Sequence, residues 1–180
     1  MLLCAWMCGC GDDGYEDSTY LRVETSNITT VTNVQTNYSV GDILYFETNI
    51  PFLLTSASGK PIDLEEIQLE ASQIGSVISL YKLNDVGGFE PVLLTSNQLV
   101  GDAGVYEEFV TFFYEKTSSG FTNRMGIKLD TAGTYEVRSS NLAKMPIFYQ
   151  LDASITDTRI DLTSFLKQSS PDRDFTFTVE

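Results

Sequence analysis

Short stretches of alternating hydrophobic and polar residues follow one another along the chain from Tyr20 onward. In residues 43–48, Leu44 and Phe46 fall on one side of an extended chain and Glu47 falls on the other, which is the period of a half-buried strand. Val, Ile, Thr, Tyr and Phe recur in these stretches, as is typical of strands. The clearest predicted strands occupy residues 20–24, 43–48, 77–83, 109–116, 125–129 and 175–179.

Turn-forming residues separate the predicted strands. Residues 84–88 (Asn-Asp-Val-Gly-Gly) end one strand, and residues 117–120 (Thr-Ser-Ser-Gly) are predicted to form the turn of a hairpin between residues 109–116 and 125–129. Residues 101–104 (Gly-Asp-Ala-Gly) are predicted to form a loop whose glycines allow a positive φ. The chain is therefore predicted to be all-β.

Two segments also carry apolar residues at helical spacing. Leu64, Ile67 and Ala71 would share one face of a helix, and the pattern there leaves helix and strand open. Residues 105–113 show a similar spacing, but their β-branched and aromatic composition favours a strand. Neither segment changes the predicted class.

Residues 129–137, Leu-Asp-Thr-Ala-Gly-Thr-Tyr-Glu-Val, resemble the tyrosine corner of immunoglobulin-like sandwiches. The resemblance implies that Tyr135 buries its ring and hydrogen-bonds upstream backbone, that Gly133 takes the tight turn, and that Asp130 hydrogen-bonds the amides of its own turn. A plain β-turn followed by an exposed tyrosine is the alternative. With the strand pattern, the resemblance implies an immunoglobulin-like two-sheet antiparallel β-sandwich.

The first ten residues differ from the rest of the chain. They contain all three cysteines and the single tryptophan, and they carry no charged side chain. Met7-Cys8-Gly9-Cys10 resembles the bacterial lipobox, in which a small residue precedes a cysteine that is lipidated and becomes the new N-terminus. Gly9 fits the small position, whereas Met7 and Cys8 depart from the usual residues. The resemblance implies that Cys10 carries a lipid anchor, and the lack of a basic n-region is consistent with a start codon placed too late.

An acidic run follows directly, because residues 11–17 are Gly-Asp-Asp-Gly-Tyr-Glu-Asp. It resembles the export signal that sends lipoproteins of Bacteroidota to the cell surface, which implies that Asp12 and Asp13 act as the address. A solvated acidic linker is the alternative. A metal or redox cluster of the cysteines is disfavoured, because no histidine and no cysteine after Cys10 can complete a shell of four ligands.

These features divide the chain into three segments. Residues 1–9 are predicted to be a truncated lipoprotein signal segment, residues 10–19 a lipidated acidic tether, and residues 20–180 the immunoglobulin-like sandwich. The strand entry at residues 39–46, the corner at residues 132–135 and the terminal strand together resemble uncharacterised Bacteroidota cell-surface lipoproteins. The resemblance implies a lipid-anchored place at the outer membrane and cell surface, and it brings no biochemical activity with it.

The amino-acid composition limits the partners and the catalytic mechanisms that are open to the chain. With 11 Lys and Arg against 25 Asp and Glu, the formal charge of −14 disfavours nucleic acid as a partner. The absence of histidine excludes mechanisms that use imidazole as base or metal ligand. The pairs Glu65–Glu66 and Glu107–Glu108 are adjacent in sequence, so in a strand they would point to opposite faces and not converge on one bond. No catalytic residue and no cofactor is predicted.

Calcium is the one metal that the acidic residues suggest. Carboxylate oxygens are the ligands that calcium prefers, but none of these residues matches the spacing of an EF-hand loop, so no metal site is predicted. The residues considered are Asp12, Asp13, Glu16, Asp17, Asp152, Asp157 and Asp161.

The sequence therefore predicts a non-catalytic, lipid-anchored interaction or structural module, with the membrane and an envelope protein or glycan as its partners. The alternative is a glycan-binding accessory lipoprotein of a polysaccharide-uptake system, a role that the resemblance implies. Sugar-binding surfaces use exposed aromatic rings, and a row of them on one sheet would favour this alternative. The candidate rings are Tyr106, Tyr114, Phe121 and Tyr149, although core or sheet positions are more typical of such residues.

Overall fold

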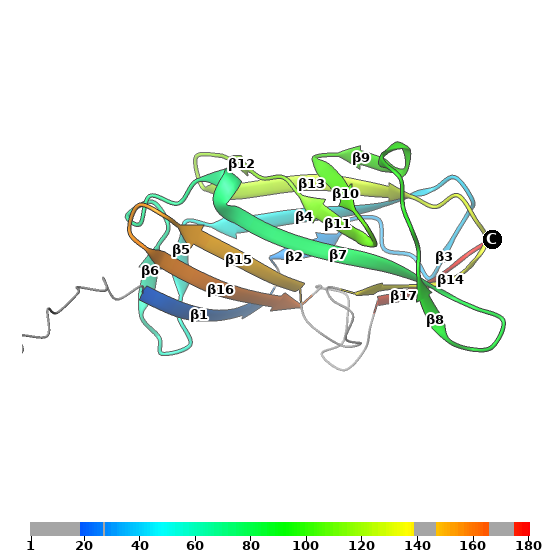
Figure 1. Cartoon of the computed structure of the whole chain (residues 1–180), viewed down its shortest axis with the longest axis horizontal. Helices are drawn as coiled ribbons and strands as arrows, with labels where there is room; N and C mark the ends of the chain where they lie inside the picture. The colour runs from blue at the N-terminus through cyan, green and yellow to red at the C-terminus, as the bar shows by residue number, and fades with distance from the viewer. Residues whose placement is uncertain (1–18, 27, 139–146, 166–174) are drawn as a thin grey trace, which may run out of the picture.

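The computed structural model describes residues 19–26, 28–138, 147–165 and 175–180, and these residues form an all-β sandwich (Figure 1). A ten-stranded sheet and a five-stranded sheet make its two layers, and a two-stranded sheet of β5 (Leu53–Thr55) and β6 (Pro61–Asp63) lies at one end. The predicted all-β, two-sheet architecture is confirmed. None of the helices in the described ranges has the length and apolar character needed to span a membrane.

The five-stranded sheet is built on two nine-residue antiparallel strands, β4 (Ile43–Pro51) and β13 (Gly120–Lys128). The short strand β2 (Thr29–Val31) pairs with β4. Two further short strands, β12 (Glu115–Lys116) and β9 (Leu99–Gly101), pair with β13. The two long strands therefore carry the face on which the candidate site lies.

The ten-stranded sheet is organised around β7 (Ile74–Leu83), its longest strand. Its main path runs through β1 (Thr19–Ser26), β16 (Thr158–Phe165), β15 (Ile147–Ala153), β7, β14 (Gly133–Arg138), β17 (Phe175–Val179) and β3 (Asn37–Tyr38). Off this path, β7 also pairs with β8 (Phe89–Pro91) and β11 (Phe109–Phe112), and β11 pairs with β10 (Ala103–Tyr106).

Two strand pairs of the large sheet are parallel, whereas the sequence predicts antiparallel sheets. β1 runs parallel to β16 along its eight residues, and β17 runs parallel to β3. The members of each pair are far apart in the sequence, so no hairpin turn fixes their relative direction. The remaining pairs between described strands are antiparallel, as predicted.

The core lies between the two sheets and follows the predicted alternation. In β4, Leu44 and Phe46 are fully buried while Glu47 is exposed. Ile78 and Leu80 of β7 belong to the same buried cluster from the opposite sheet. Each such side chain contributes roughly 1.5–3 kcal/mol through removal of its apolar surface from water. The alternation thus decides which face of each strand packs inward.

Two predicted segments differ in detail. Residues 64–68 form turns after β6 and lead to a short 3-10 helix, η1 (Ala71–Gln73); a second, η2 (Ser96–Gln98), precedes β9. The apolar spacing there reflects the burial of Leu64 rather than a helix face. The predicted strand at 109–116 is divided into β11 and β12, because β11 folds back onto β10 and only β12 forms the predicted hairpin with β13.

Candidate functional site

The outer face of the five-stranded sheet is polar. Glu47 of β4 lies directly opposite Arg124 of β13 and beside Thr30 of β2. Two residues further along, on the same face, Asn49 faces Thr122. Side chains alternate across a strand, so the residues between these positions point into the core, and the outer face keeps a continuous set of charged, amide and hydroxyl groups.

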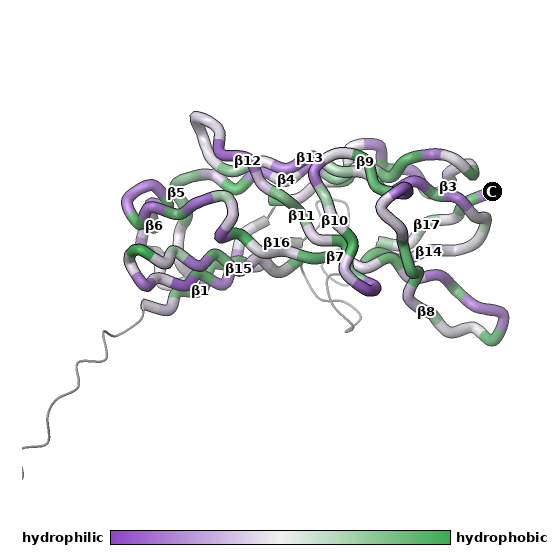
Figure 2. Tube along the Cα trace, turned by 45° about the horizontal axis from the view of Figure 1, so that its top comes forward, coloured by the Kyte–Doolittle hydropathy of each residue, from purple (hydrophilic) through white to green (hydrophobic). Residues whose placement is uncertain are grey.

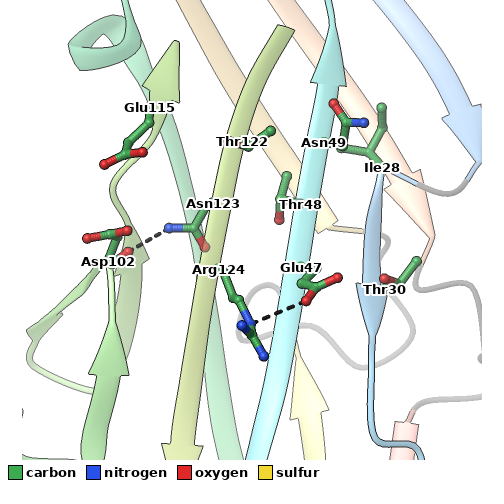
Figure 3. A pocket seen from close by; sticks show the side chains of 10 residues that line it. All are labelled: Ile28, Thr30, Glu47, Thr48, Asn49, Asp102, Glu115, Thr122, Asn123 and Arg124. Carbon is green, nitrogen blue, oxygen red and sulfur yellow. Dashed lines mark hydrogen bonds and ion pairs between the residues drawn. The ribbon is translucent and has the colours of Figure 1, made fainter. Parts of the chain in front are cut away.

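These side chains surround a hollow of about 380 Å³ (Figure 3). Its size lies within the range of roughly 300–1,000 Å³ that is typical of small-molecule sites. Figure 3 shows Glu115 and Asp102 on one side of β13, Asn49 and Thr30 on the far side of β4, and Arg124 between the two groups. The complete lining is Ile28, Thr30, Glu47, Thr48, Asn49, Asp102, Glu115, Thr122, Asn123 and Arg124.

Arg124 is held in this hollow by two contacts. Its Nε lies 3.3 Å from Oε1 of Glu47, and its guanidinium carbon lies 5.3 Å from the centre of the Tyr45 ring. The Tyr45 ring rests on the sheet over Gly126, where a Cβ would come within 3.0 Å of the ring. Arg124 and Glu47 are 68% and 48% exposed, so the pair adds about 1 kcal/mol of stability at most and serves mainly to orient two polar groups.

Asn123 fixes the chain beneath the hollow. Its side-chain amide is almost completely buried and donates two hydrogen bonds, to the backbone oxygens of Asp102 at 2.6 Å and Phe113 at 2.7 Å. The adjoining Gly101 has a φ of +83°, and a Cβ there would overlap the carbonyl oxygen of Arg124. These contacts hold the crossing from β9 to β10, and with it the position of Asp102 at the edge of the hollow.

Buried hydroxyls line the inner side of the same sheet. The Oγ1 atoms of Thr29 and Thr48 lie 2.7 Å apart, and the Tyr149 hydroxyl bonds to Thr29. Nearby, the Tyr114 hydroxyl bonds to Ser76. Burial raises the pKa of both phenols well above 10.0, so both stay neutral at physiological pH. They cannot act as bases there. The bond between Tyr149 of β15 and Thr29 of β2 joins the two sheets, and the bond between Tyr114 and Ser76 holds the link between β11 and β12 to β7.

The predicted anchor and export residues, Cys10, Asp12 and Asp13, lie outside the described residues. Their roles stay predictions.

The residues of the predicted tyrosine corner lie at the start of β14. The Tyr135 ring is buried, and its hydroxyl donates to the backbone oxygen of Thr131 at 2.7 Å. Gly133 has a φ of +149°, and a Cβ there would press on the side chain of Lys82. The carboxylate of Asp130 lies on the surface, 3.0 Å from the Lys128 ammonium. The Tyr135 ring, the Thr131 carbonyl and Gly133 therefore lie together in the segment that leads into β14, and Asp130 lies at the surface beside it.

The predicted sugar-contact rings are mostly interior. Tyr114, Phe121 and Tyr149 are buried, so they cannot form a platform for a ligand. Only Tyr106 is exposed, at 70%. Sequence reasoning missed Phe113, which is also exposed; the burial of its neighbours Phe112 and Tyr114 makes it point outward.

Sequence reasoning also missed the hollow itself. The alternation in residues 43–48 does predict that Glu47 points away from the core. Its partner Arg124 could not be found in the same way, because the register between β4 and β13 is a property of the folded sheet.

Of the acidic residues considered for calcium, Asp12, Asp13, Glu16 and Asp17 lie outside the described residues, and Asp152, Asp157 and Asp161 lie on or next to β15 and β16. Within the described ranges, no group of three or more His, Cys, Asp or Glu side chains is placed to hold a metal ion. Asp161 instead pairs with Arg159 at 3.3 Å, and Asp152 lies 4.0 Å from the same guanidinium. Asp152 and Asp161 are therefore part of a surface network of ion pairs around Arg159.

A comparison with models of known protein families finds no match to this chain, and a comparison with curated proteins finds no significant relative.

Proposed function

We propose that this chain is a non-catalytic, lipid-anchored module of the outer membrane and cell surface, in which an immunoglobulin-like sandwich is displayed for interaction with other envelope components. The observation that carries the proposal is the position of the first strand. β1 begins at Thr19, nine residues after Cys10, and is held along its length by β16. An extended segment of nine residues reaches about 30 Å. Such a tether would lift the sandwich off a membrane in which Cys10 is anchored.

The described carboxylates support a role without catalysis. Four of them lie within 3.3 Å of a lysine or arginine nitrogen, so their charge is compensated within the fold rather than directed at a substrate. The pairs are Glu47 with Arg124, Asp130 with Lys128, Glu136 with Arg138, and Asp161 with Arg159.

The anchor is tested by metabolic labelling with a palmitate analogue. The wild-type chain should incorporate the label, and Cys10→Ser should abolish incorporation because it removes the acceptor thiol. Cys8→Ser is the matched control and should leave labelling intact. A full-length chain that starts at Met1 and carries no lipid by mass spectrometry would contradict the proposal.

The export address is tested separately. Replacing Asp12 and Asp13 by alanine should leave the chain acylated but reduce its digestion by protease added to intact cells. Replacing Glu16 and Asp17 instead provides a control with the same change in charge. Equal digestion of the wild-type chain and both variants would assign the acidic run to a plain linker.

The polar hollow favours a second candidate, which is saccharide binding. Sugar hydroxyls both donate and accept hydrogen bonds, and the hollow offers the Arg124 guanidinium and the Asn49 amide next to carboxylates. Affinity electrophoresis through gels containing soluble polysaccharides tests this candidate. Retardation by one polysaccharide that is lost in Arg124→Ala, and kept in the exposed control Arg22→Ala, would support it. Unchanged mobility across the panel would oppose it.

A further inference from the structure

The hairpin of β10 and β11 presents one face to the core and the other to solvent. The inward residues pair as Val105 with Val110, and Val110 is fully buried. The next pair, Tyr106 with Phe109, points the other way, and so does Phe113 just beyond β11. Two aromatic side chains of β11 and its extension therefore share the outer face with Tyr106 of β10.

Exposure is high on this face for such large side chains. Tyr106 is 70% exposed and Phe113 is 55% exposed, while Phe109 is half-buried. Phe113 lies over Gly104, where a Cβ would come within 2.9 Å of its ring. The glycine therefore allows the ring to pack closely against the backbone of the hairpin. We call Tyr106, Phe109 and Phe113 the aromatic face.

Acidic side chains frame the aromatic face. Glu107 and Glu108 form the turn between the two strands, and Asp102 and Glu115 lie at the other end of the hairpin. In Figure 2 the hairpin crosses the front of the molecule, and its turn has the colour of hydrophilic residues. An exposed aromatic centre within a charged rim is the usual arrangement of a protein–protein interface.

We propose that the aromatic face docks a protein segment in which lysine or arginine residues flank apolar side chains. The inference rests on the proposed role as an interaction module and names the chemistry of its partner. Charge complementarity favours this occupant, because four carboxylates border the face and the whole chain carries −14. A second copy of this chain would bring the same negative charges together. A saccharide would also stack on exposed rings, but a neutral sugar carries no charge to complement the four carboxylates, and Phe109 and Phe113 offer it no hydrogen-bonding group.

The test uses the full chain, labelled with ¹⁵N, and three defined probes: a peptide of alternating lysine and leucine, its counterpart of alternating glutamate and leucine, and a soluble β-glucan oligosaccharide. The lysine peptide should shift the amide resonances of residues 103–113, and its affinity should fall as salt is raised. The glutamate peptide should produce no shift. The double variant of Tyr106→Ser and Phe113→Ser should weaken binding of the lysine peptide by about tenfold or more, because exposed aromatic anchors dominate such interfaces.

A matched pair of exposed apolar residues provides the control. Val86 and Leu93 are 90% and 73% exposed and lie outside the hairpin, so Val86→Ser with Leu93→Ser should leave the affinity unchanged. Equal affinity of both double variants, or shifts spread over the acidic surface without preference for residues 103–113, would overturn the proposal. Shifts of these residues by the glucan alone would overturn it in favour of a glycan surface. The labelling test at Cys10 does not involve the hairpin, so each claim can fail by itself.

Discussion

Two regions of the core are built on different physical principles. Under β14, β17 and β3 the core is aromatic: Phe177 stacks on Tyr135 with ring centres 5.6 Å apart and meets the edge of Tyr38 at 5.1 Å. Under β2, β4 and β13 a row of polar residues crosses the inner face, where Thr29 faces Thr48 and Thr48 faces Asn123. Both regions are buried to the same degree.

The difference teaches what each region contributes. Ring packing depends on shape and buried area, so it stabilises this part of the fold mainly by removing apolar surface from water. The polar row is directional, since Thr29, Thr48 and Asn123 are adjacent only in the observed register. A slip of one residue in β4 or β13 would turn Thr48 or Asn123 outward and bring Glu47 or Arg124 into the core. The aromatic region thus contributes buried apolar area, and the polar row contributes directional hydrogen bonds, at some cost: Asn123 Oδ1 has no hydrogen-bond partner among the described residues.

The aromatic region is broken most severely at Phe177, which contacts three rings. Phe177→Ala should lower the free energy of unfolding by about 3–5 kcal/mol, because it removes a large buried side chain and leaves a cavity. Urea unfolding followed by circular dichroism measures the change. Phe113→Ala is the matched control at an exposed ring and should cost less than about 0.5 kcal/mol.

The polar row is broken by a change of one atom. Asn123→Asp keeps the shape of the side chain but places a carboxylate against two carbonyl oxygens in the core, and should cost about 3 kcal/mol at pH 7. Burial would raise the pKa of the new carboxyl, so its penalty should shrink as pH falls toward the ordinary value for Asp. Asn49→Asp, on the exposed face of the neighbouring strand, should change stability little. A loss that is the same at pH 4 and pH 7 would contradict the assignment.

Tyr135 combines both kinds of interaction, because its ring packs in the aromatic region and its hydroxyl donates a directional hydrogen bond. Tyr135→Phe keeps the stacking on Phe177 and removes the bond to the Thr131 carbonyl, so we expect a loss of about 1–2 kcal/mol. Thermal unfolding measures it. A neutral result would mean that ring packing alone holds this connection.

Raising the pH tests the polar region with the smallest expected effect, through the protonation of tyrosine. Burial raises the pKa of Tyr149 above 10.0. Above pH 10, the unfolded chain therefore releases a phenol proton that the folded chain keeps. The free energy of unfolding should therefore be independent of the ionisation of this phenol below pH 10. Above pH 10 it should fall by about 1.4 kcal/mol per pH unit for each such tyrosine. Tyr149→Phe should reduce the slope by that amount in denaturant titrations between pH 10 and 11. An unchanged slope would show that burial against Thr29 of the polar row does not protect this phenol.

The amount of structure that the sequence predicts differs between these regions. Local alternation identifies Phe175 and Phe177 as inward residues of a closing strand, and the residues around Tyr135 predict a buried ring. The polar row leaves no local signal, because threonine and asparagine at inward positions look like any exposed polar residue. The hollow at Glu47 and Arg124 is hidden for the same reason.

By itself, the sequence determined the all-β class, most strands and the direction in which their side chains point, because a period of two residues is a local property of an extended chain. It also limited the chemistry through its charge and its lack of histidine. Only the tertiary structure decided which strands are neighbours: β1 with β16 in parallel, β11 with β10 rather than with β13, and Glu47 with Arg124. Strand pairing joins residues far apart in the chain, and their register depends on how the whole core packs rather than on any local pattern.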